Sequence, residues 1–351
     1  MAKTYGVGVI GVGGIANTHF PGWNESPYTE LVALSDTVPE TLERVGGAQG
    51  VTRLYEKAKD LINDPNVDIV DICTPNAFHT PLAVAALQAG KHVICEKPLA
   101  PTPADIRKMI KARDESGKLL MTAQHFRFQD RSRALKAEVD RGLLGEVYHA
   151  RSWMLRRCLT PLRPGFYLKE LSNGGPCIDI GVHILDLTLW MMGNPAPATV
   201  SGVTTNRLTK QPGAFSMWGG TIPAEHDVEE MAAAFVRFES GATLMLEVSW
   251  QLHHDTMGED MQMWLYGDKA GVHWPSNVSV TAINETQQLT RTELQKAQGR
   301  EPHAEECMVF ADCVANGKPS PVPAEQSLQV IGILNALYQS AEKGKEVAVR
   351  L

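Results

Sequence analysis

Short apolar runs alternate with segments of helical pattern through the first 125 residues. Residues 16–23 and 81–89 are two of the segments that can form helices. A regular alternation of short strands with helices is typical of βαβ units, which build a parallel sheet. The pattern therefore predicts an α/β fold with a doubly wound parallel sheet at the N-terminal end. The predicted strands cover residues 5–10, 31–35, 67–73, 92–95 and 119–122.

The rest of the chain has many strand-like runs and few helices. Helical patterns cover residues 131–141, 302–316 and 325–343, and the turn Glu239-Ser240-Gly241 joins two runs as a hairpin. So many strands in one region predict an α+β domain with a large, mostly antiparallel open sheet and helices on one face. The strand-like runs cover residues 146–156, 198–207, 231–238, 242–252, 260–266, 271–274, 278–284, 287–294 and 346–351.

A glycine-rich turn follows the first predicted strand. Gly11-x-Gly13-x-x-Ala16 has the G-x-G-x-x-[GA] pattern of dinucleotide-binding turns. Gly11 permits the tight turn, Gly13 lets the backbone approach a pyrophosphate, and Ala16 lets the helix pack on the strand. A bound dinucleotide is therefore expected here. The residues of the turn expected to contact it are Gly11, Gly13, Gly14 and Ile15.

Asp36 ends the second predicted strand, 23 residues after Gly13. This is close to the offset of the carboxylate that binds the ribose hydroxyls of a dinucleotide. Asp36 repels a 2′-phosphate, and the following Thr37-Val38-Pro39 offers no Arg or Lys to bind one. The sequence therefore predicts NAD in preference to NADP as the cofactor. A helix cap or turn aspartate is the alternative interpretation of Asp36.

Polar residues follow the next two strands, where ligands of a doubly wound sheet collect. Thr74-Pro75-Asn76 comes after the third strand, and Glu96-Lys97-Pro98 comes after the fourth. We expect Thr74, Asn76, His79, Glu96 and Lys97 to lie beside the nucleotide, with the ammonium of Lys97 in the cleft. Turn chemistry alone is the alternative for Thr74 and Asn76, and a surface lysine before a proline turn is the alternative for Lys97.

A second motif carries acid and base groups at helical spacing. Asp179, His183 and Asp186 fall on one face of a predicted helix that ends at Gly193. Two carboxylates beside one imidazole can hold it in one tautomer and suit it to proton transfer near neutral pH. A structural histidine and a metal site of the Asp-x3-His type are the alternatives. No metal is expected, because no other cluster of His, Cys or Glu has ligand spacing in the sequence.

These motifs together resemble the glucose-fructose oxidoreductase, inositol dehydrogenase and rhizopine catabolism (Gfo/Idh/MocA) family. The resemblance rests on Gly11-x-Gly13-x-x-Ala16, Glu96-Lys97-Pro98 and Asp179-x-Gly181-x-His183, and it covers essentially the whole chain. It implies a Rossmann domain, a C-terminal domain with a large open sheet, and oxidation or reduction of one carbinol of a sugar or cyclic polyol. It also implies that Lys97, Asp179 and His183 are catalytic and that the Lys97-Pro98 bond can be cis.

The resemblance leads to a division into two domains. Residues 1–124 are the expected NAD-binding domain, and residues 125–351 are the expected substrate-binding and oligomerisation domain, whose last helices pack back toward the first. The sheet face without helices needs cover, and a second copy of the chain is the simplest cover. The expected assembly is a homodimer or homotetramer through the C-terminal sheet.

Residues for substrate recognition are less well defined by the sequence. Arg127 follows the last strand of the first domain, and His125 is a second candidate there; a simple hinge is the alternative. Arg156 and Tyr167 bound an arginine-rich segment that we expect to overhang the substrate, although a solvated loop explains it equally well. The substrate-binding residues expected are Lys97, Arg127, Arg156, Tyr167, Asp179 and His183.

Composition agrees with an enzyme acting on a small carbohydrate or polyol. The 351 residues carry a net charge of −7 and no basic stripe, so nucleic acid and membranes are not expected partners. Six scattered cysteines and the absence of a signal peptide favour a cytoplasmic setting. Two other functions fit the same motifs: redox-neutral, NAD-dependent cleavage of a glycoside, and nucleotide sensing without catalysis.

Overall fold

The computed structural model describes residues 3–294 and 299–351. The chain divides into two compact units. The first contains Met1–Phe128 and Arg300–Leu328, and the second contains Gln129–Gly299 and Gln329–Leu351. The expected division at residue 124 placed everything that follows in the second domain, whereas residues 300–328 belong to the first unit.

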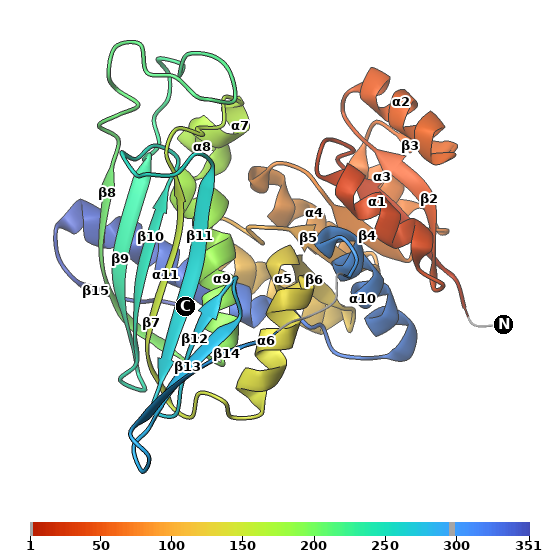
Figure 1. Cartoon of the computed structure of the whole chain (residues 1–351). Coiled ribbons are helices and arrows are strands. Elements are labelled where there is room, and N and C mark those ends of the chain that lie inside the picture. Colours follow the sequence, from red (N-terminus) through yellow and green to blue (C-terminus); the bar gives the residue numbers. More distant parts are fainter. Residues whose placement is uncertain (1–2, 295–298) are drawn as a thin grey trace. The chain divides into compact units, whose positions relative to one another are not determined.

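The first unit is built on a sheet of six strands in the order β3-β2-β1-β4-β5-β6 (Figure 1). Every pair of neighbouring strands is parallel. This is the order of a dinucleotide-binding doubly wound sheet, so the predicted fold class is confirmed. The strands are β1 (Tyr5–Ile10), β2 (Thr29–Ser35), β3 (Arg53–Tyr55), β4 (Ile69–Ile72), β5 (His92–Glu96) and β6 (Leu120–Ala123).

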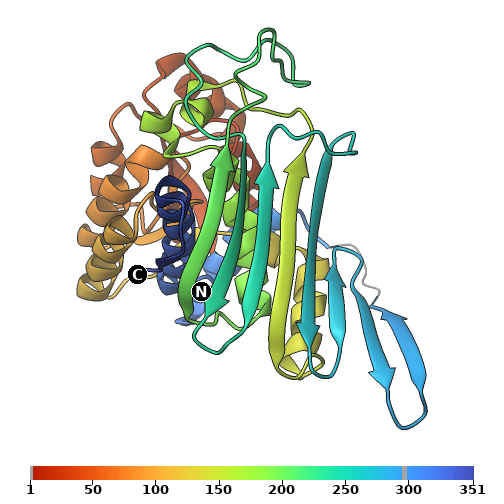
Figure 2. The same ribbon diagram turned by 90° about the vertical axis from the view of Figure 1, so that its left-hand side faces the viewer.

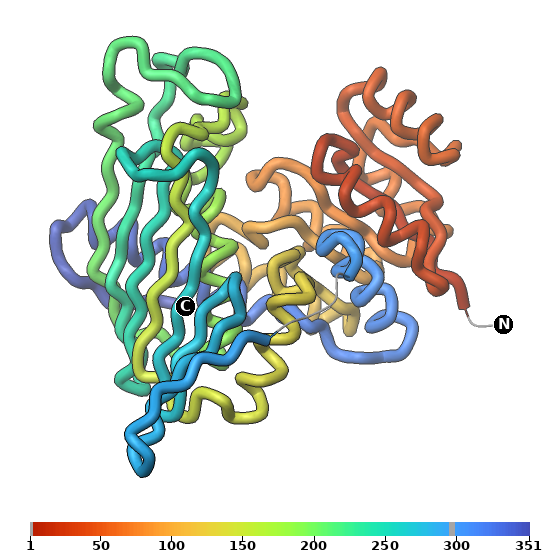
Figure 3. Tube along the Cα trace, in the orientation of Figure 1, coloured from red at the N-terminus to blue at the C-terminus, as the bar shows by residue number. Residues whose placement is uncertain are grey.

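Helices pack against this sheet, and one of them comes from far along the chain. In Figure 3 the blue helix α10 (Pro302–Asn316) lies against the red helix α1 (Ala16–Glu25). Gly22 permits this close approach, because a Cβ there would lie 2.2 Å from the carbonyl oxygen of Ala304. The remaining helices of the unit are α2 (Pro39–Gln49), α3 (Ala58–Asn63), η1 (Asn76–Phe78), α4 (His79–Gln88), α5 (Pro103–Ser116) and η2 (His125–Phe128).

The core of the first unit explains why α10 belongs to it. Phe20 and Trp23 on the inner face of α1 are buried together with Cys307 and Phe310 of α10. Burying a large apolar side chain of this kind contributes roughly 1.5–3 kcal/mol. The amphipathic pattern of residues 302–316 therefore serves the core of the first unit.

The second unit contains a nine-stranded sheet in the order β14-β13-β12-β11-β7-β10-β9-β8-β15. Figure 2 shows this sheet face-on. Its neighbouring strands are antiparallel except for β7 and β10. The predicted mostly antiparallel sheet is confirmed. The strands are β7 (Val147–Arg156), β8 (Pro197–Thr205), β9 (Met231–Phe238), β10 (Thr243–Ser249), β11 (Glu259–Gly267), β12 (Gly271–Trp274), β13 (Val278–Ile283), β14 (Gln288–Glu293) and β15 (Val347–Ala348).

Helices cover part of this sheet. Helix α9 (Val182–Met191) contacts β7 and β11, and α11 (Ala324–Lys343) packs on β8, where a Cβ on Gly202 would lie 2.8 Å from the side chain of Leu337. The short helices α7 (Pro164–Tyr167) and α8 (Lys169–Ser172) precede α9, and α6 (Asp130–Asp140) precedes β7. No helix within residues 3–294 and 299–351 is long and apolar enough to cross a membrane. Assembly through the sheet stays a prediction.

Candidate active site

The residues predicted to bind the nucleotide and to react fall into two groups, one in each unit. Lys97 and the nucleotide-binding residues belong to the first unit, and Asp179 and His183 belong to the second. Each group has its own supporting contacts.

The glycine turn of the first unit has the geometry expected of a phosphate-binding turn. Gly11 has a φ of 86°, and a Cβ there would lie 2.8 Å from the carbonyl oxygen of Cys73. Gly13 and Gly14 are exposed, and a Cβ on either would meet no atom within 4 Å. Ile15 leads into α1. The backbone of Gly13 and Gly14 therefore faces open space at the N-terminus of a helix, as binding of a pyrophosphate requires.

Asp36 at the end of β2 is tied to this turn. Its Oδ2 accepts a hydrogen bond from the backbone N–H of Val12 at 2.9 Å, and its Oδ1 accepts one from Val38 at 3.0 Å. The carboxylate is half-buried beside the glycine turn. This position suits contact with a ribose, and the N–H donor from Val38 holds the carboxylate in place.

The segment after β4 contains Thr74, Asn76 and His79. The Thr74 hydroxyl is buried and has no hydrogen-bond partner among the described residues, so it is available to a cofactor atom. His79 is buried, and its ring nitrogens lie 2.9 Å from the carbonyl oxygen of Thr74 and 2.8 Å from that of Pro98. Both nitrogens are thus engaged by backbone. His79 joins the two segments that carry Thr74 and Lys97.

Lys97 follows β5, and the Lys97–Pro98 peptide bond is cis. The preceding Glu96 is buried and turned into the unit. Its Oε2 accepts a hydrogen bond from the backbone N–H of Lys97 at 2.9 Å, and its Oε1 lies 3.1 Å from Nε2 of His19. Nδ1 of His19 lies 3.0 Å from Oδ2 of Asp71. A buried series of polar contacts therefore runs from β4 through α1 to the backbone of Lys97.

The pKa shifts of His19 and Glu96 indicate which of these buried side chains are charged. Burial opposes the charged form of His19, but its neighbours, Cys307 and Asp71 among them, raise its pKa well above the usual value. Burial also raises the pKa of Glu96, yet the hydrogen bond and charge of His19, together with the charges of Lys97 and His303, outweigh burial and lower it to about 2. Glu96 and His19 thus form an ion pair. Burial raises the pKa of the nearby Glu306 well above its usual value, so that carboxyl group is neutral.

The same residues come close enough together to be considered as metal ligands. His19, Asp71 and Cys307 have ligand atoms close enough to hold a metal ion, and so do His19, Glu96 and Glu306. The sequence shows no ligand spacing for these residues, because they lie far apart along the chain and converge only in the fold. Both nitrogens of His19 face carboxylate oxygens at hydrogen-bond distance. That arrangement needs a proton on each nitrogen and leaves no lone pair for a metal.

Arg127 and His125 lie in η2 of the first unit. Arg127 is buried, and its guanidinium donates a hydrogen bond to the side chain of Gln326. His125 stacks on His303 with ring centroids 3.9 Å apart, and burial lowers its pKa to about 3. The partner of Arg127 therefore lies in α11, and the partner of His125 lies in α10.

The helix of the second unit departs from the predicted spacing. Residues Cys177–Gly181 form a π-helical turn, and the regular helix α9 begins only at Val182. A π-turn has more residues per turn than an α-helix, so the expected shared face of Asp179 and His183 does not follow from α-helical geometry. Such turns occur frequently at functional sites. The glycines and proline that precede Cys177 gave no sequence signal for it.

Asp179 is held by residues from the ends of two strands. Its Oδ2 accepts a hydrogen bond from Nε1 of Trp250 at 3.2 Å and lies 3.8 Å from a guanidinium nitrogen of Arg156. Arg156 also donates to Glu259 at 2.7 Å, and its guanidinium lies 5.1 Å from the ring centre of Trp218. The predicted residue Arg156 therefore lies beside the predicted residue Asp179.

His183, Asp186 and Tyr167 are buried in the second unit. His183 and Asp186 both lie on α9. Tyr167 ends α7, and its ring stacks on that of His226 with centroids 6.3 Å apart. Its carbonyl oxygen accepts a hydrogen bond from the N–H of Asp227 at 3.2 Å. Tyr167 thus fastens the segment before α9 to the loop before β9.

Similarity to known proteins decides the family. Residues 5–124 match the oxidoreductase family with an NAD-binding Rossmann fold, and residues 132–273 match the GFO/IDH/MocA C-terminal domain. The D-glucoside 3-dehydrogenase of Escherichia coli K12 is 33% identical over 346 residues, which cover 97% of this chain and 96% of the relative. The chain belongs to the Gfo/Idh/MocA oxidoreductase family. The predicted family and the predicted cofactor, NAD, are confirmed.

Other relatives of this family act on several carbohydrates and polyols. The myo-inositol 2-dehydrogenase of Thermotoga maritima is 26% identical and covers 97% of each chain. The crystal structure of an oxidoreductase domain protein from Kribbella flavida has a TM-score of 0.87 at 23% identity and covers 99% of this chain and all of that one. A levoglucosan dehydrogenase in complex with NADH and levoglucosan has a TM-score of 0.83 at 22% identity, with 99% and 100% coverage. These structures support the fold.

Proposed function

We propose that the protein is an NAD-dependent dehydrogenase that oxidises a secondary alcohol of a sugar, with a D-glucoside as the first substrate to test. The observation that carries the proposal is the similarity to D-glucoside 3-dehydrogenase along 97% of the chain. Lys97, Asp179 and His183 supply the acid and base groups that the reaction needs.

NAD fits the residues of the first unit. Gly11, Gly13, Gly14 and Ile15 would hold the pyrophosphate at the N-terminus of α1. Asp36 would bind the ribose hydroxyls, and Thr74 and Asn76 would contact the cofactor from the end of β4. Glu96 and His79 would act indirectly, because their polar atoms contact the backbone beside Lys97 and Thr74.

Oxidation of a secondary alcohol removes a hydride from carbon and a proton from oxygen. NAD, held by the residues named above, would supply the hydride acceptor. In our proposal the imidazole of His183 takes the hydroxyl proton, and the ammonium of Lys97 donates a hydrogen bond to the same oxygen and stabilises its alkoxide character. Asp179 carries the negative charge that stabilises the imidazolium. Trp250 and Arg156 hold the Asp179 carboxylate in place.

The second unit also offers groups to the substrate. Arg156 lies beside Asp179 and can donate to a sugar hydroxyl with the part of its guanidinium that does not contact Glu259. We assign Arg127 and Tyr167 weaker roles, since Arg127 contacts Gln326 and Tyr167 fastens a loop. Both act in this proposal by supporting the backbone near the substrate.

The test is NADH formation by purified protein with NAD and methyl β-D-glucopyranoside, myo-inositol or levoglucosan. We expect NADH with at least one of these compounds, and its loss in Lys97→Ala and in His183→Ala while NAD still binds. Full activity in either variant contradicts the assigned chemistry. No NADH from any of them, despite NAD binding, contradicts the substrate class.

A further inference from the structure

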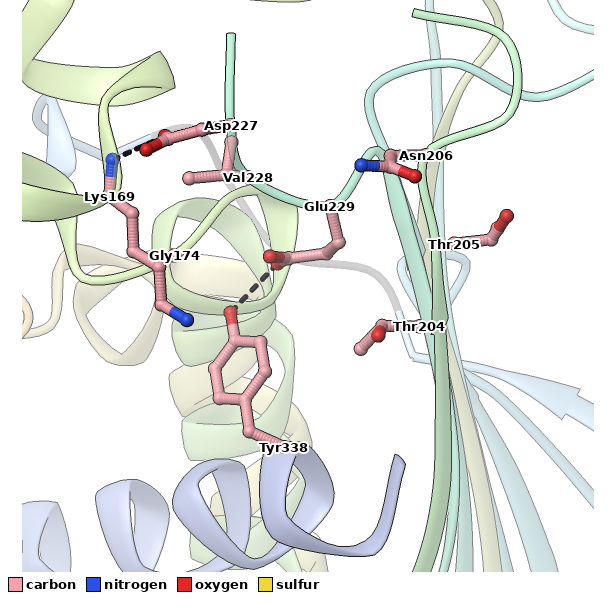
Figure 4. Close-up of a pocket in the computed structure, with 9 residues that line it drawn as sticks. All are labelled: Lys169, Gly174, Thr204, Thr205, Asn206, Asp227, Val228, Glu229 and Tyr338. Atoms are coloured by element: carbon pink, nitrogen blue, oxygen red, sulfur yellow. Dashed lines mark hydrogen bonds between the residues drawn. The ribbon is translucent and has the colours of Figure 1, made fainter. Parts of the chain in front are cut away.

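A half-buried glutamate, Glu229, contacts the backbone of the segment that leads to Asp179. The carboxylate of Glu229, in the loop before β9, accepts hydrogen bonds from the N–H of Gly175 at 3.0 Å and from that of Cys177 at 3.1 Å. The hydroxyl of Tyr338 in α11 donates to the same carboxylate at 2.8 Å (Figure 4). All four residues belong to the second unit.

The contact continues through the backbone to Asp179. The N–H of Gly175 donates to Glu229, and the carbonyl oxygen of Gly175 accepts hydrogen bonds from the N–H of Ile178 at 3.1 Å and of Asp179 at 3.0 Å. One residue, Gly175, therefore links the Glu229 carboxylate to the backbone N–H of Asp179. Any movement of Gly175 displaces the start of the π-turn that carries Asp179 and leads into His183.

Two glycines make this contact possible. A Cβ on Gly175 would lie 2.1 Å from the carbonyl oxygen of Glu229, and a Cβ on Gly174 would lie 2.1 Å from the hydroxyl of Tyr338. Real Cβ atoms do not approach other atoms so closely. Glycine at positions 174 and 175 therefore allows this segment to pack against Glu229 and Tyr338. This packing accounts for two residues of the motif that have no part in the proposed chemistry.

Glu229 is half-buried and borders a cavity. Burial raises the pKa of Glu229 above its usual value, although the hydrogen bonds from Gly175 and Tyr338 oppose this effect. A cavity of about 230 Å³ adjoins it and is lined also by Lys169 and Asp227 (Figure 4). An ionised carboxylate at the N-terminal end of a helical segment interacts favourably with the unpaired N–H groups there.

We propose that Glu229, with Tyr338, is a positioning residue that fixes Gly175 and Cys177 and thereby sets the place of Asp179 and His183. This inference rests on the proposed function, in which Asp179 and His183 act on the substrate hydroxyl. Glu229 itself contacts neither reacting atoms nor cofactor in this account.

The test compares two adjacent glutamates. Glu229→Gln keeps the size of the side chain and removes its charge, and Tyr338→Phe removes one donor. Glu230→Gln is the matched control, because Glu230 is the neighbouring residue and its carboxylate also accepts backbone hydrogen bonds, but from the N–H groups of Leu208 and Thr209. A misplacement of about 1 Å at a reacting group costs roughly 100-fold in rate. We expect kcat with the active sugar to fall about tenfold in Glu229→Gln, with KM and the Kd of NAD nearly unchanged, and kcat to stay near wild type in Glu230→Gln.

Hydrogen–deuterium exchange provides a measurement that needs no substrate. Amides of residues 175–181 should exchange faster in Glu229→Gln and in Tyr338→Phe than in wild type, and at the wild-type rate in Glu230→Gln. Wild-type kcat and wild-type exchange in Glu229→Gln overturn the positioning role. If Asp179→Asn and His183→Ala keep full activity, the proposed function fails instead, whatever the exchange data show.

Discussion

Lys97 in the first unit and Asp179 in the second both lie on backbone that a glutamate holds by hydrogen bonds. The pKa values of these two glutamates shift in opposite directions. In each case a glutamate accepts a hydrogen bond from a nearby backbone N–H: the buried Glu96 from Lys97, and the half-buried Glu229 from Gly175. Burial raises the pKa of Glu96, but the imidazolium of His19 and the nearby charges of Lys97 and His303 together lower it to about 2. Glu229 accepts hydrogen bonds from neutral donors, Gly175, Cys177 and Tyr338, and burial raises its pKa.

The difference shows that the orientation of a glutamate carboxylate and the pKa of that group depend on different contacts. The hydrogen bonds to Glu229 orient its carboxylate without offsetting the effect of burial on its pKa, whereas the charged groups around Glu96 do offset it. Glu96, which holds the backbone of Lys97, should therefore stay ionised in moderate acid. Burial disfavours the ionised form of Glu229, which holds the segment before Asp179.

The largest effect should come from removing the reacting groups themselves. Lys97→Ala and His183→Ala remove one group from each unit, and each should lower kcat by roughly 10²–10⁴-fold, the usual contribution of a positioned acid or base. Steady-state kinetics and NAD titration measure the two effects. If one variant loses NAD binding as strongly as turnover, the substituted residue serves the cofactor. The two units then do not each contribute a reacting group.

Glu96→Gln should have the next largest effect. Both groups that face the Glu96 carboxylate, His19 Nε2 and the N–H of Lys97, are donors, and a Gln amide offers only one acceptor. The lost interaction corresponds to a pKa shift from 4.5 to about 2, or about 3 kcal/mol. Chemical denaturation should show this loss in the first unit. Glu230→Gln is the control, and equal losses in the two variants contradict the special role of Glu96.

The pH dependence of stability should differ in sign for the two glutamates. The folded pKa of Glu96 is depressed, so its contribution is present above the unfolded value of 4.5 and is lost as pH falls toward about 2. The folded pKa of Glu229 is raised, so its contribution is present below 4.5 and is lost as pH rises through the raised value. Denaturation of wild type, Glu96→Gln and Glu229→Gln from pH 3 to pH 7 measures both slopes; slopes of the same sign refute this contrast.

The smallest effect concerns cofactor choice. Asp36→Ala removes the carboxylate that disfavours a 2′-phosphate and one acceptor for the N–H of Val12. We expect the ratio of kcat/KM for NAD to that for NADP to fall about tenfold, equivalent to about 1.4 kcal/mol. An unchanged ratio means that Asp36 serves only to hold the glycine turn.

Sequence patterns predicted the features that depend on local spacing. Gly11, Asp36 and Lys97 were found because each follows a strand of the parallel sheet, and the rule that ligands meet at those strand ends needs no tertiary information. The strands of the second unit were found within a few residues. The short strand β3 and helices α3, α7 and α8 were missed because three to six residues carry too little periodicity.

The missed supports of the site depend on contacts between distant residues. His19 lies 52 residues from Asp71 and 77 from Glu96, and Glu229 lies 54 from Gly175. No local pattern distinguishes such residues, although His19, Phe20 and Trp23 share the buried face of α1 and a histidine among core positions was a usable signal. The π-turn at Cys177–Gly181 was missed because it depends on packing that the sequence alone does not reveal.

The most direct test of the central claim is the yield of NADH per molecule of sugar consumed, measured with excess NAD and methyl β-D-glucopyranoside. The account predicts one NADH for each sugar oxidised and an intact glycosidic bond. Consumption of the glycoside with release of methanol and no accumulated NADH would contradict it and identify redox-neutral glycoside cleavage as the function.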